Sequence, residues 1–432
     1  MNLPTPKPNY RQPTVMAWAF YDFANSAFAT TVLAGFFPIF FKQYWSSGAD
    51  AATSTFQLGA ANSIASLAIV ILAPVLGAIA DKGSAKKRFL MFFACMGIVM
   101  TGALYVVAQG QWVLAVVLYG FATVGFSGAN LFYDSLLVNV ADDKHVDMVS
   151  AIGYGFGYLG GGILFGINVL MTLYPEFFGF ADASAAVRAS FVCVAVWWAV
   201  FSVPLLILVR EPDRTARASE GSAVAAGIQQ LVDSLREIRK LKVVFLFLIA
   251  YWLYIDGVDT IVRMAVDYGL SIGLNSNDLL VALLITQFVG FPSAIVFGKF
   301  GERIGAKRGI MVAICVYIAV CVGGYFMRNA LDFYIMAGIV GLVQGGIQAL
   351  SRSFYTRIIP RNKAAEFFGF YNMLGKFAAV LGPLLMGWVG FATGNPRLSI
   401  LSIIILFVAG AVLLSQVDEV AGRAAARDLE AV

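Results

Sequence analysis

The run Trp18-Ala-Phe-Tyr-Asp-Phe-Ala-Asn25 recurs past the middle of the chain as Trp252-Leu-Tyr-Ile-Asp-Gly-Val-Asp259. Both copies place a tryptophan, an aromatic residue, an aspartate and a short polar residue in the same order within a long apolar stretch. An aspartate is costly there, because an apolar membrane interior does not solvate its charge. Repetition of the same costly residue in the same setting predicts that the chain consists of two related halves.

The composition around these runs is that of an integral membrane protein. Hydrophobic residues make up 60% of the 432 positions and charged residues 13%. Soluble globular proteins are roughly 45–50% apolar and about 25% charged, so a single soluble core could not bury this much apolar surface. The segment 1–14 lacks the cleavage pattern of a secretory signal, and we expect the apolar stretch after it to be a retained anchor.

The chain contains twelve apolar segments long enough to cross a membrane, since a spanning helix needs about 20 residues. They cover approximately residues 15–41, 55–80, 89–108, 111–138, 148–173, 188–209, 243–270, 278–299, 308–327, 331–357, 363–390 and 398–416. Helices are expected because these stretches lack the alternation of barrel strands. We predict an all-α integral membrane fold of twelve transmembrane helices in two pseudo-symmetric six-helix bundles, residues 1–210 and 243–416. A cytoplasmic linker, 211–242, joins the bundles, and a cytoplasmic tail, 417–432, follows them.

The basic residues are distributed unequally across the predicted membrane. Of the 30 lysines and arginines, the connections on one side hold only Lys42, Arg188, Arg328 and Arg397, whereas most others lie on the side of the termini. The positive-inside rule therefore places both termini in the cytoplasm.

The connecting segments beyond the spans are polar. In the linker, apolar residues recur at helical spacing between basic ones, from Ile228 to Leu241. This pattern indicates an amphipathic helix on the cytoplasmic leaflet, and a linker helix without a regulatory role is the alternative. The tail after Ser415 is short, and we expect it to be frayed.

Two loops share one pattern: a glycine, an acid four positions later, a base directly after it, and then a basic cluster. The first reads Gly77-Ala-Ile-Ala-Asp81-Lys82-Gly83-Ser84-Ala-Lys-Lys-Arg88, and the second reads Gly298-Lys-Phe-Gly-Glu302-Arg303-Ile-Gly305-Ala-Lys-Arg308. Glycine permits close helix packing and a tight turn, and the acid can cap a helix N-terminus in the other half. Basic residues that only set the topology are the alternative. The pattern resembles the cytoplasmic signature loop of the major facilitator superfamily, although Gly83 falls one place early and Ser84 stands where glycine is expected.

Other residues resemble one branch of that superfamily, the vacuole effluxer-like permeases, which include the fungal autophagy-related amino-acid effluxer. They are Tyr21-Asp22-Phe-Ala-Asn25-Ser26, Gly345-Gly-Ile-Gln348-Ala-Leu-Ser351-Arg352-Ser353, and Glu366-Phe-Phe-Gly369-Phe-Tyr371 with Gly375-Lys376. The resemblance implies a bacterial member in the inner membrane that moves a small organic solute by alternating access. It implies amino acids only as one candidate solute.

Seven charged residues lie at least four positions inside the ends of the predicted spans: Asp22, Asp134, Asp256, Asp259, Arg263, Arg352 and Lys376. An unpaired charge at mid-membrane costs roughly 2.5–3.5 kcal/mol, so we expect these residues to face a bundle interior or a wet cavity. In the superfamily, spans 1, 4, 7 and 10 surround a central cavity, and all of these residues except Lys376 lie on those spans.

On predicted span 7, Asp256, Asp259 and Arg263 share one helix face. A structural Asp259–Arg263 pair is one interpretation, and it leaves Asp256 unpaired. Because removal from water favours the neutral form of a carboxyl group, we hypothesise that Asp22 and Asp256 exchange the coupling protons. Arg263 or Lys376 would then bind an anionic group such as a carboxylate.

Alignment of predicted spans 4 and 10 places Asp134 opposite Arg352, near the cytoplasmic ends. Opposite charges at these positions suggest a gate that pairs when that side closes. A static pair of Arg352 with Glu366 or Asp81 is the alternative. If the gate exists, exchanging the two charges should restore the activity that each single variant loses.

Further polar residues are candidates for the solute and proton pathway: Tyr21, Asn25, Asn130, Gln348 and Tyr371. Asn130 and Gln348 occupy equivalent positions in the two halves, whereas each tyrosine taken alone is more often a packing residue. The many glycines of predicted span 5, from Gly153 to Gly166, indicate close packing against a neighbouring helix.

Metal and cofactor chemistry is not expected. The single histidine, His145, lies in a polar loop, and the four cysteines lack metal-ligand spacing. We expect a monomer that carries out proton-coupled export, without a nucleotide-binding motif, a cofactor, a nucleic-acid partner or enzymatic activity. Proton-coupled import of a small organic solute is the first alternative, and a non-transporting membrane sensor or enzyme is the second.

Overall fold

The computed structural model describes residues 12–48, 57, 64–65, 67–69, 76–77, 79–80, 85–211, 241–274, 276–377 and 381–430. The regular secondary structure of these residues is helical throughout. Ten of the helices are long and apolar enough to cross a membrane, and the shorter apolar stretch Leu381–Gly390 adds to them. The predicted second span, 55–80, lies largely outside the described residues. The predicted all-α membrane fold is confirmed, and the helix count is consistent with twelve spans.

The first half begins with one long span that changes helix type along its length. α1 (Pro13–Ala27) continues as η2 (Phe28–Phe36), α2 (Phe37–Phe40) and η3 (Phe41–Trp45), of which η2 and η3 are π-helical. Pro38 lies in the first turn of α2, where its missing N–H interrupts the regular hydrogen bonding. π-helical turns are frequent at functional sites, and η2 directly follows the segment that holds Asp22 and Asn25.

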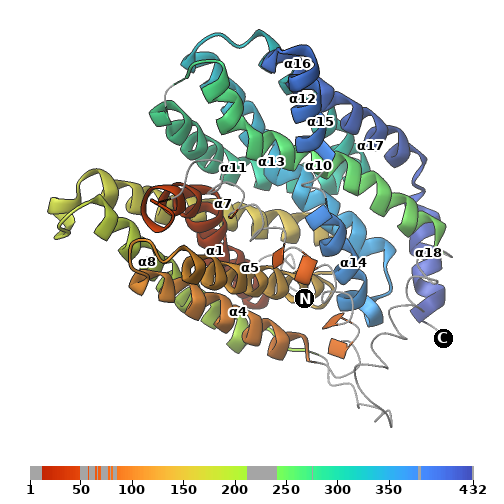
Figure 1. Cartoon of the computed structure of the whole chain (residues 1–432). Helices are drawn as coiled ribbons and strands as arrows, with labels where there is room; N and C mark the ends of the chain where they lie inside the picture. Colours follow the sequence, from red (N-terminus) through yellow and green to blue (C-terminus); the bar gives the residue numbers. More distant parts are fainter. Residues whose placement is uncertain are drawn as a thin grey trace, which may run out of the picture.

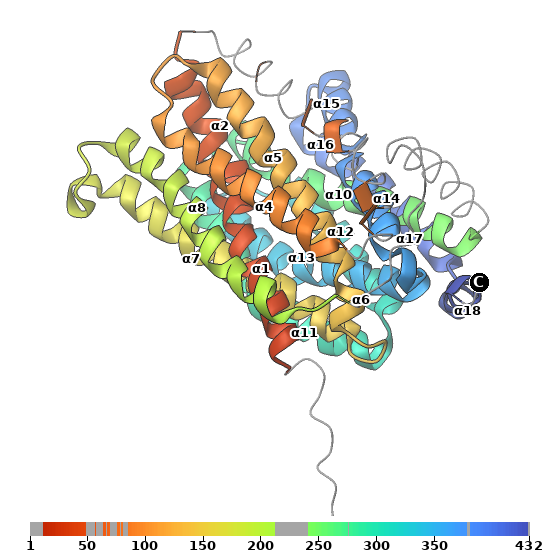
Figure 2. The same ribbon diagram turned by 90° about the horizontal axis from the view of Figure 1, so that it is seen from below.

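The other helices of the first half pack around this span. They are α4 (Lys86–Ala103), η4 (Leu104–Val106), α5 (Trp112–Ser135), α6 (Leu137–Val140), α7 (Val146–Leu173), η5 (Pro175–Phe178) and α8 (Ala183–Leu208). α1 contacts α7 and α8, and α4 contacts α5 and α8 (Figure 2).

The second half follows the linker. Its helices are α10 (Lys242–Ser271), α11 (Ser276–Ile304), α12 (Ala306–Phe326), α13 (Ala330–Ile358), η6 (Arg361–Lys363), α14 (Ala364–Phe377), α15 (Leu381–Thr393), α16 (Pro396–Ser402), α17 (Ile404–Gln416) and α18 (Glu419–Glu430). α14 and α15 together occupy the predicted eleventh span. α11 and α13 pack against α7 and so form a large part of the contact between the halves.

The buried apolar side chains form two clusters, one for each half. The first runs from Val15 to Val209 and the second from Leu241 to Val417. Only Ala365 joins the first cluster from the second half, and Val138 joins the second cluster from the first half, among the described residues. Figure 1 shows the two groups of helices, coloured red to yellow and green to blue. This division agrees with the predicted pair of bundles.

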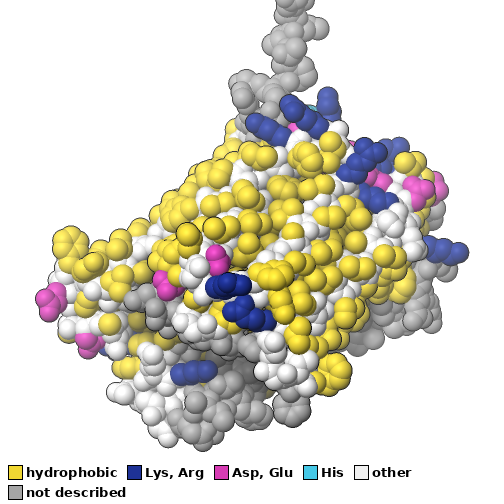
Figure 3. Space-filling view, turned by 90° about the horizontal axis from the view of Figure 1, so that it is seen from above, with side chains coloured by type: hydrophobic (Ala, Val, Ile, Leu, Met, Phe, Trp, Pro, Cys, Tyr) yellow, Lys and Arg dark blue, Asp and Glu magenta, His cyan; other side chains and the backbone are white. Residues whose placement is uncertain are grey.

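The outer surface of the spans is apolar. Val106, Leu173 and Ile207 are 74%, 62% and 68% exposed, and Figure 3 shows one face covered over much of its extent by hydrophobic side chains. Soluble proteins rarely expose apolar patches of this extent, so the surface fits contact with lipid.

The C-terminal tail is more ordered than its sequence indicated. Residues 419–430 form α18, which packs against α10 and α13. Gly422 lies so close to α13 and α10 that a Cβ there would be 2.9 Å from Ile358 and Val243. The prediction of a frayed tail was therefore wrong, while the predicted linker helix lies outside the described residues.

Candidate functional site

A cavity of about 380 Å³ lies between the two bundles. α1, η2, α5 and α7 form one wall, and α10, α11, α13 and α14 form the other. Its polar lining includes Asp22, Asn25, Ser26, Thr30, Asn130, Asp134, Gln287, Gln344, Gln348, Arg352 and Asn372, together with Tyr133, Tyr154, Tyr158, Tyr251 and Tyr371. Polar and charged groups of both halves therefore face one space.

Arg352 of α13 reaches across to the first half and is only 1% exposed. Its Nη1 lies 2.9 Å from Oδ1 of Asp134 and 3.8 Å from Oδ2 of Asp22. Its Nε donates to Oγ of Ser150 and its Nη2 to the Ser150 carbonyl, both at 2.9 Å. The pairing predicted between Asp134 and Arg352 is thus present, and the fixed guanidinium geometry is satisfied by several acceptors at once.

The tryptophan of the repeated run holds this arginine from one side. Trp18 stacks on Tyr133 with ring centroids 4.4 Å apart and donates from Nε1 to the Tyr133 carbonyl at 3.0 Å. The Arg352 guanidinium lies 4.9 Å from the Trp18 centroid and 4.2 Å from that of Tyr154, which adds cation–π attraction. Gly153 leaves room for the stack, because a Cβ there would lie 2.9 Å from Nη2 of Arg352.

Asp22 faces the cavity beside this cluster. Its Oδ2 accepts from the Tyr133 hydroxyl at 3.3 Å, and its Oδ1 accepts from the Ser26 hydroxyl at 3.4 Å. One guanidinium therefore faces two carboxylates, those of Asp22 and Asp134. With both ionised, the three side chains carry a net charge of −1, and one bound proton makes the group neutral.

Amide side chains extend the polar lining beyond the charged cluster. Nδ2 of Asn25 donates to Oδ1 of Asn130. Across the cavity, the hydroxyl of Tyr158 on α7 donates to Oε1 of Gln348 on α13 at 3.3 Å. The structure thus brings Asn130 and Gln348, the equivalent positions of the two halves, to the same cavity.

Further polar contacts join the halves where α13 ends and α7 begins. Asp147 accepts from Nη2 of Arg357 at 2.6 Å and from the Ser353 hydroxyl at 2.5 Å. Nη2 of Arg361 lies 2.6 Å from Oδ1 of Asp143. We call these contacts, together with the Arg352–Asp134 pair, the interbundle lock.

Asp256 does not share the surroundings of Asp22. Its carboxylate accepts from the backbone N–H groups of Leu381 at 3.1 Å and Gly382 at 3.0 Å, and from the Thr260 hydroxyl at 3.3 Å. It is fully buried and lies outside the described lining of the cavity. Asp256 therefore does not join Asp22 at the central cavity, and the first turn of α15 supplies donors and a favourable dipole to its carboxylate.

The other residues predicted for the pathway differ in their positions relative to the cavity. Tyr21 is buried against Tyr133, with ring centroids 5.1 Å apart, behind the cavity lining. Tyr371 does line the cavity and stacks on Tyr251 at 4.1 Å. Asp259 is half-buried on α10. The side chains of Arg263 and Lys376, and residues Asp81 and Lys82, lie outside the description.

The signature-loop glycines contact the opposite half in an equivalent manner. A Cβ on Gly77 would lie 2.3 Å from the carbonyl oxygen of Ala365, and a Cβ on Gly298 would lie 2.5 Å from the Cβ of Ala151. Glu302 and Arg303 are exposed at the end of α11, and Gly305 precedes α12 with φ of 91°. Close approach explains the first two glycines, and a left-handed conformation explains Gly305.

Sequence reasoning missed a polar stripe on α7. Asp147, Ser150, Tyr154 and Tyr158 follow one another at helical spacing, and each contacts a residue of α13. Such a stripe in an otherwise apolar span marks the face turned toward polar neighbours. The spacing of these four polar residues is present in the sequence, but the glycines of the same span form the more conspicuous pattern.

The family model described as "Vacuole effluxer Atg22 like" matches residues 11–427. An uncharacterised MFS-type transporter of Bacillus subtilis (strain 168), YxiO, is 41% identical over 405 residues, covering 93% of this chain and 94% of YxiO. Autophagy-related protein 22 of Saccharomyces cerevisiae (strain ATCC 204508 / S288c) is 22% identical over 513 residues, covering 98% of this chain and 96% of its own.

Solved structures share the fold at lower identity. The MFS proton:xylose symporter XylE matches with a TM-score of 0.70 at 13% identity, covering 95% of this chain and 96% of its own. The MFS transporter FucP in the outward conformation matches with a TM-score of 0.68 at 13% identity, covering 95% and 100%. These matches show the common two-bundle fold.

Proposed function

Because the chain belongs to the vacuole effluxer Atg22-like family of major facilitator transporters, we propose that it exports a small organic solute in exchange for protons, by alternating access. It is a multi-pass membrane protein and a secondary transporter, not an enzyme. An amino acid or similar metabolite is the proposed solute, and the bacterial inner membrane is the proposed location. The observation that carries the proposal is a cavity between the bundles with charged and amide groups on both walls.

The interbundle lock supports the alternating-access part of the proposal. With both termini in the cytoplasm, α13 ends and α7 begins on the cytoplasmic side, so the lock closes the cavity there. In Figure 1 the α7–α8 connection and the α15–α16 connection, at the opposite ends of the bundles, lie well apart. The cavity would then face away from the cytoplasm, and the Arg352–Asp134 pair would act as a gate that opens in the inward-facing state.

The charge of the buried cluster supports the coupling part. Asp22, Asp134 and Arg352 bear one excess negative charge when both carboxyl groups are ionised, which a proton or a cationic group of the solute would balance. Asp22 is the more loosely held carboxylate, since its nearest guanidinium nitrogen is 3.8 Å away rather than 2.9 Å. We assign the coupling proton to Asp22, with Asn25, Asn130 and Gln348 as hydrogen-bonding groups for the solute.

Counterflow in proteoliposomes tests this function. Vesicles loaded with one unlabelled amino acid at a time should transiently concentrate the same labelled amino acid from outside. An imposed pH gradient should drive net solute movement against the proton flow, whereas movement with it would establish import. Asp22→Asn should keep counterflow and lose the response to the pH gradient, and Asp256→Asn is the matched control that keeps both. An absence of counterflow for every amino acid would overturn the proposed solute class.

A further inference from the structure

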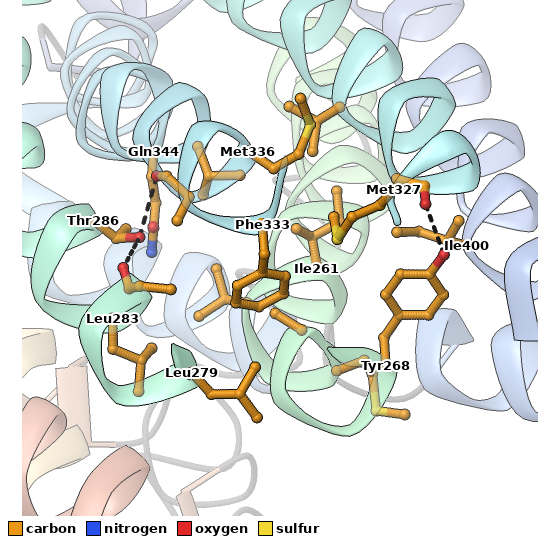
Figure 4. Close-up of a pocket in the computed structure, with 18 of the residues that line it drawn as sticks. Ile261, Tyr268, Leu279, Leu283, Thr286, Met327, Phe333, Met336, Gln344 and Ile400 are labelled. Atoms are coloured by element: carbon orange, nitrogen blue, oxygen red, sulfur yellow. Dashed lines mark hydrogen bonds between the residues drawn. The ribbon is translucent and has the colours of Figure 1, made fainter. Parts of the chain in front are cut away.

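A second cavity, of about 80 Å³, lies inside the second bundle among α10, α11, α12, α13, α15 and α16. We call it the side pocket. Val262, Leu283, Thr286 and Gln344 line both this pocket and the central cavity, so they form the partition between the two spaces. Figure 4 shows Leu283, Thr286 and Gln344 together at one end of the pocket, with Tyr268, Met327 and Ile400 at the other. The pocket thus extends away from the polar cavity into the apolar core.

The two hydroxyl groups in the wall of the side pocket donate hydrogen bonds to backbone carbonyls. The Thr286 hydroxyl donates to the Ala282 carbonyl at 3.0 Å, and the Tyr268 hydroxyl donates to the Gly324 carbonyl at 2.7 Å. The remaining wall is almost wholly apolar. A cavity of this kind holds no water, because water needs two or more polar partners, and it favours an apolar occupant.

The partition itself carries a polar group with nothing bound to it. Oε1 of Gln344 is buried and has no hydrogen-bond partner. A buried amide oxygen in this condition is costly unless a ligand supplies a donor. Gln344 lines both the polar cavity and the apolar pocket, so an amphipathic ligand matches the two sides of this partition.

We infer that the side pocket binds the apolar substituent of the transported solute, while the polar groups of that solute bind in the central cavity. This inference rests on the proposed function and adds a specificity-determining subsite to it. An apolar cavity that accepts benzene measures about 150 Å³. The side pocket is about half as large, so it selects a compact aliphatic substituent over an aromatic ring. Met264 and Met336 in its wall have flexible side chains that adjust to the shape of the occupant.

Binding of a graded series of amino acids to the purified full-length protein tests the subsite. The probes are glycine, alanine, 2-aminobutyrate, norvaline, norleucine and phenylalanine, each in the L form where chiral. Each added methylene should tighten Kd by roughly three- to fourfold, which is the factor for burial of one methylene group, until the pocket is full. Phenylalanine should bind more weakly than norleucine.

Two substitutions change the pocket in opposite directions. Ala337→Leu fills it and should abolish the gain with chain length while leaving glycine binding unchanged. Met336→Ala enlarges it and should strengthen phenylalanine binding, a gain that a misfolded protein would not give. Ala319→Leu is the matched control, since Ala319 is an exposed residue of α12 next to the pocket residue Val320.

The outcomes separate the subsite from the proposed function. If the wild-type protein binds the series with equal affinity, or if Ala337→Leu and Ala319→Leu behave alike, the subsite is overturned and the transport proposal stands. If no member of the series binds to the wild-type protein, the proposed amino-acid function is overturned together with its subsite.

Discussion

Neutralising Asp134 should open the interbundle lock. The pair between Asp134 of α5 and Arg352 of α13 joins the two halves at 2.9 Å and is buried. Removing one partner of a buried ion pair costs about 3–5 kcal/mol. Asp134→Asn keeps the size of the side chain, and Asp22 remains 3.8 Å from Arg352 as a second partner, so we expect the lower end, about 3 kcal/mol. Because about 1.4 kcal/mol is tenfold, the equilibrium should shift about 100-fold toward the open lock.

The accessibility of Ser353 measures this shift. Its side chain is fully buried and bonded to Asp147 across the interface, so a reagent reaches it only when the lock opens. Ser353→Cys would be made in a chain whose four native cysteines are replaced by alanine. The rate of maleimide labelling should then rise about 100-fold when Asp134→Asn is added.

A labelling rate that Asp134→Asn leaves unchanged would refute this reasoning, because the pair would then not hold the two halves together. Asp142→Asn is the control, since Asp142 lies in the exposed loop before α7. It should leave the rate unchanged. Retention of the helical signal in circular dichroism would show that faster labelling does not arise from unfolding.

Three further predictions concern the same region. From the sequence alone, the charge exchange Asp134→Arg with Arg352→Asp was expected to restore function. Because Asp22 also faces Arg352, the new carboxylate would face Asp22, so labelling should stay fast in the exchange variant and slow when Asp22→Asn is added; full restoration by the exchange alone would contradict the observed cluster. Gly160→Ala should lower Tm in a thermal-shift assay, since its Cβ would lie 2.2 Å from the Phe23 carbonyl oxygen and overpacking costs about 1–3 kcal/mol. In the control Gly166→Ala the Cβ would meet nothing within 4 Å and alanine is the better helix former, so Tm should not fall; equal Tm values for the two variants would count against the packing. Asp256→Asn should also lower Tm, because one amide oxygen replaces two carboxylate oxygens that accept backbone N–H groups, and a lost buried hydrogen bond costs about 1–3 kcal/mol of stability. Loss of the pH-gradient response in this variant would instead assign Asp256 to the proton pathway.

The membrane fold followed from the sequence because hydropathy and length are local properties. Each apolar stretch must form its own helix in lipid, since backbone groups find no other partners there, and the ten described spans fall where apolar stretches were counted. The pairing of Asp134 with Arg352 was one of two arrangements that the sequence left open, since equivalent positions in two related bundles lie at matching depths, and the structure contains it.

Tertiary structure alone determined the surroundings of the two repeated aspartates. Asp22 and Asp256 occupy the same place in the same sequence pattern, yet Tyr133 and Arg352 surround the first, and the backbone amides of Leu381 and Gly382 surround the second. The first turn of α15, inside the predicted eleventh span, is what brings these N–H groups to Asp256. The sequence shows which buried carboxylates need hydrogen-bond donors, whereas only the packing of helices distant in sequence determines which donors reach them.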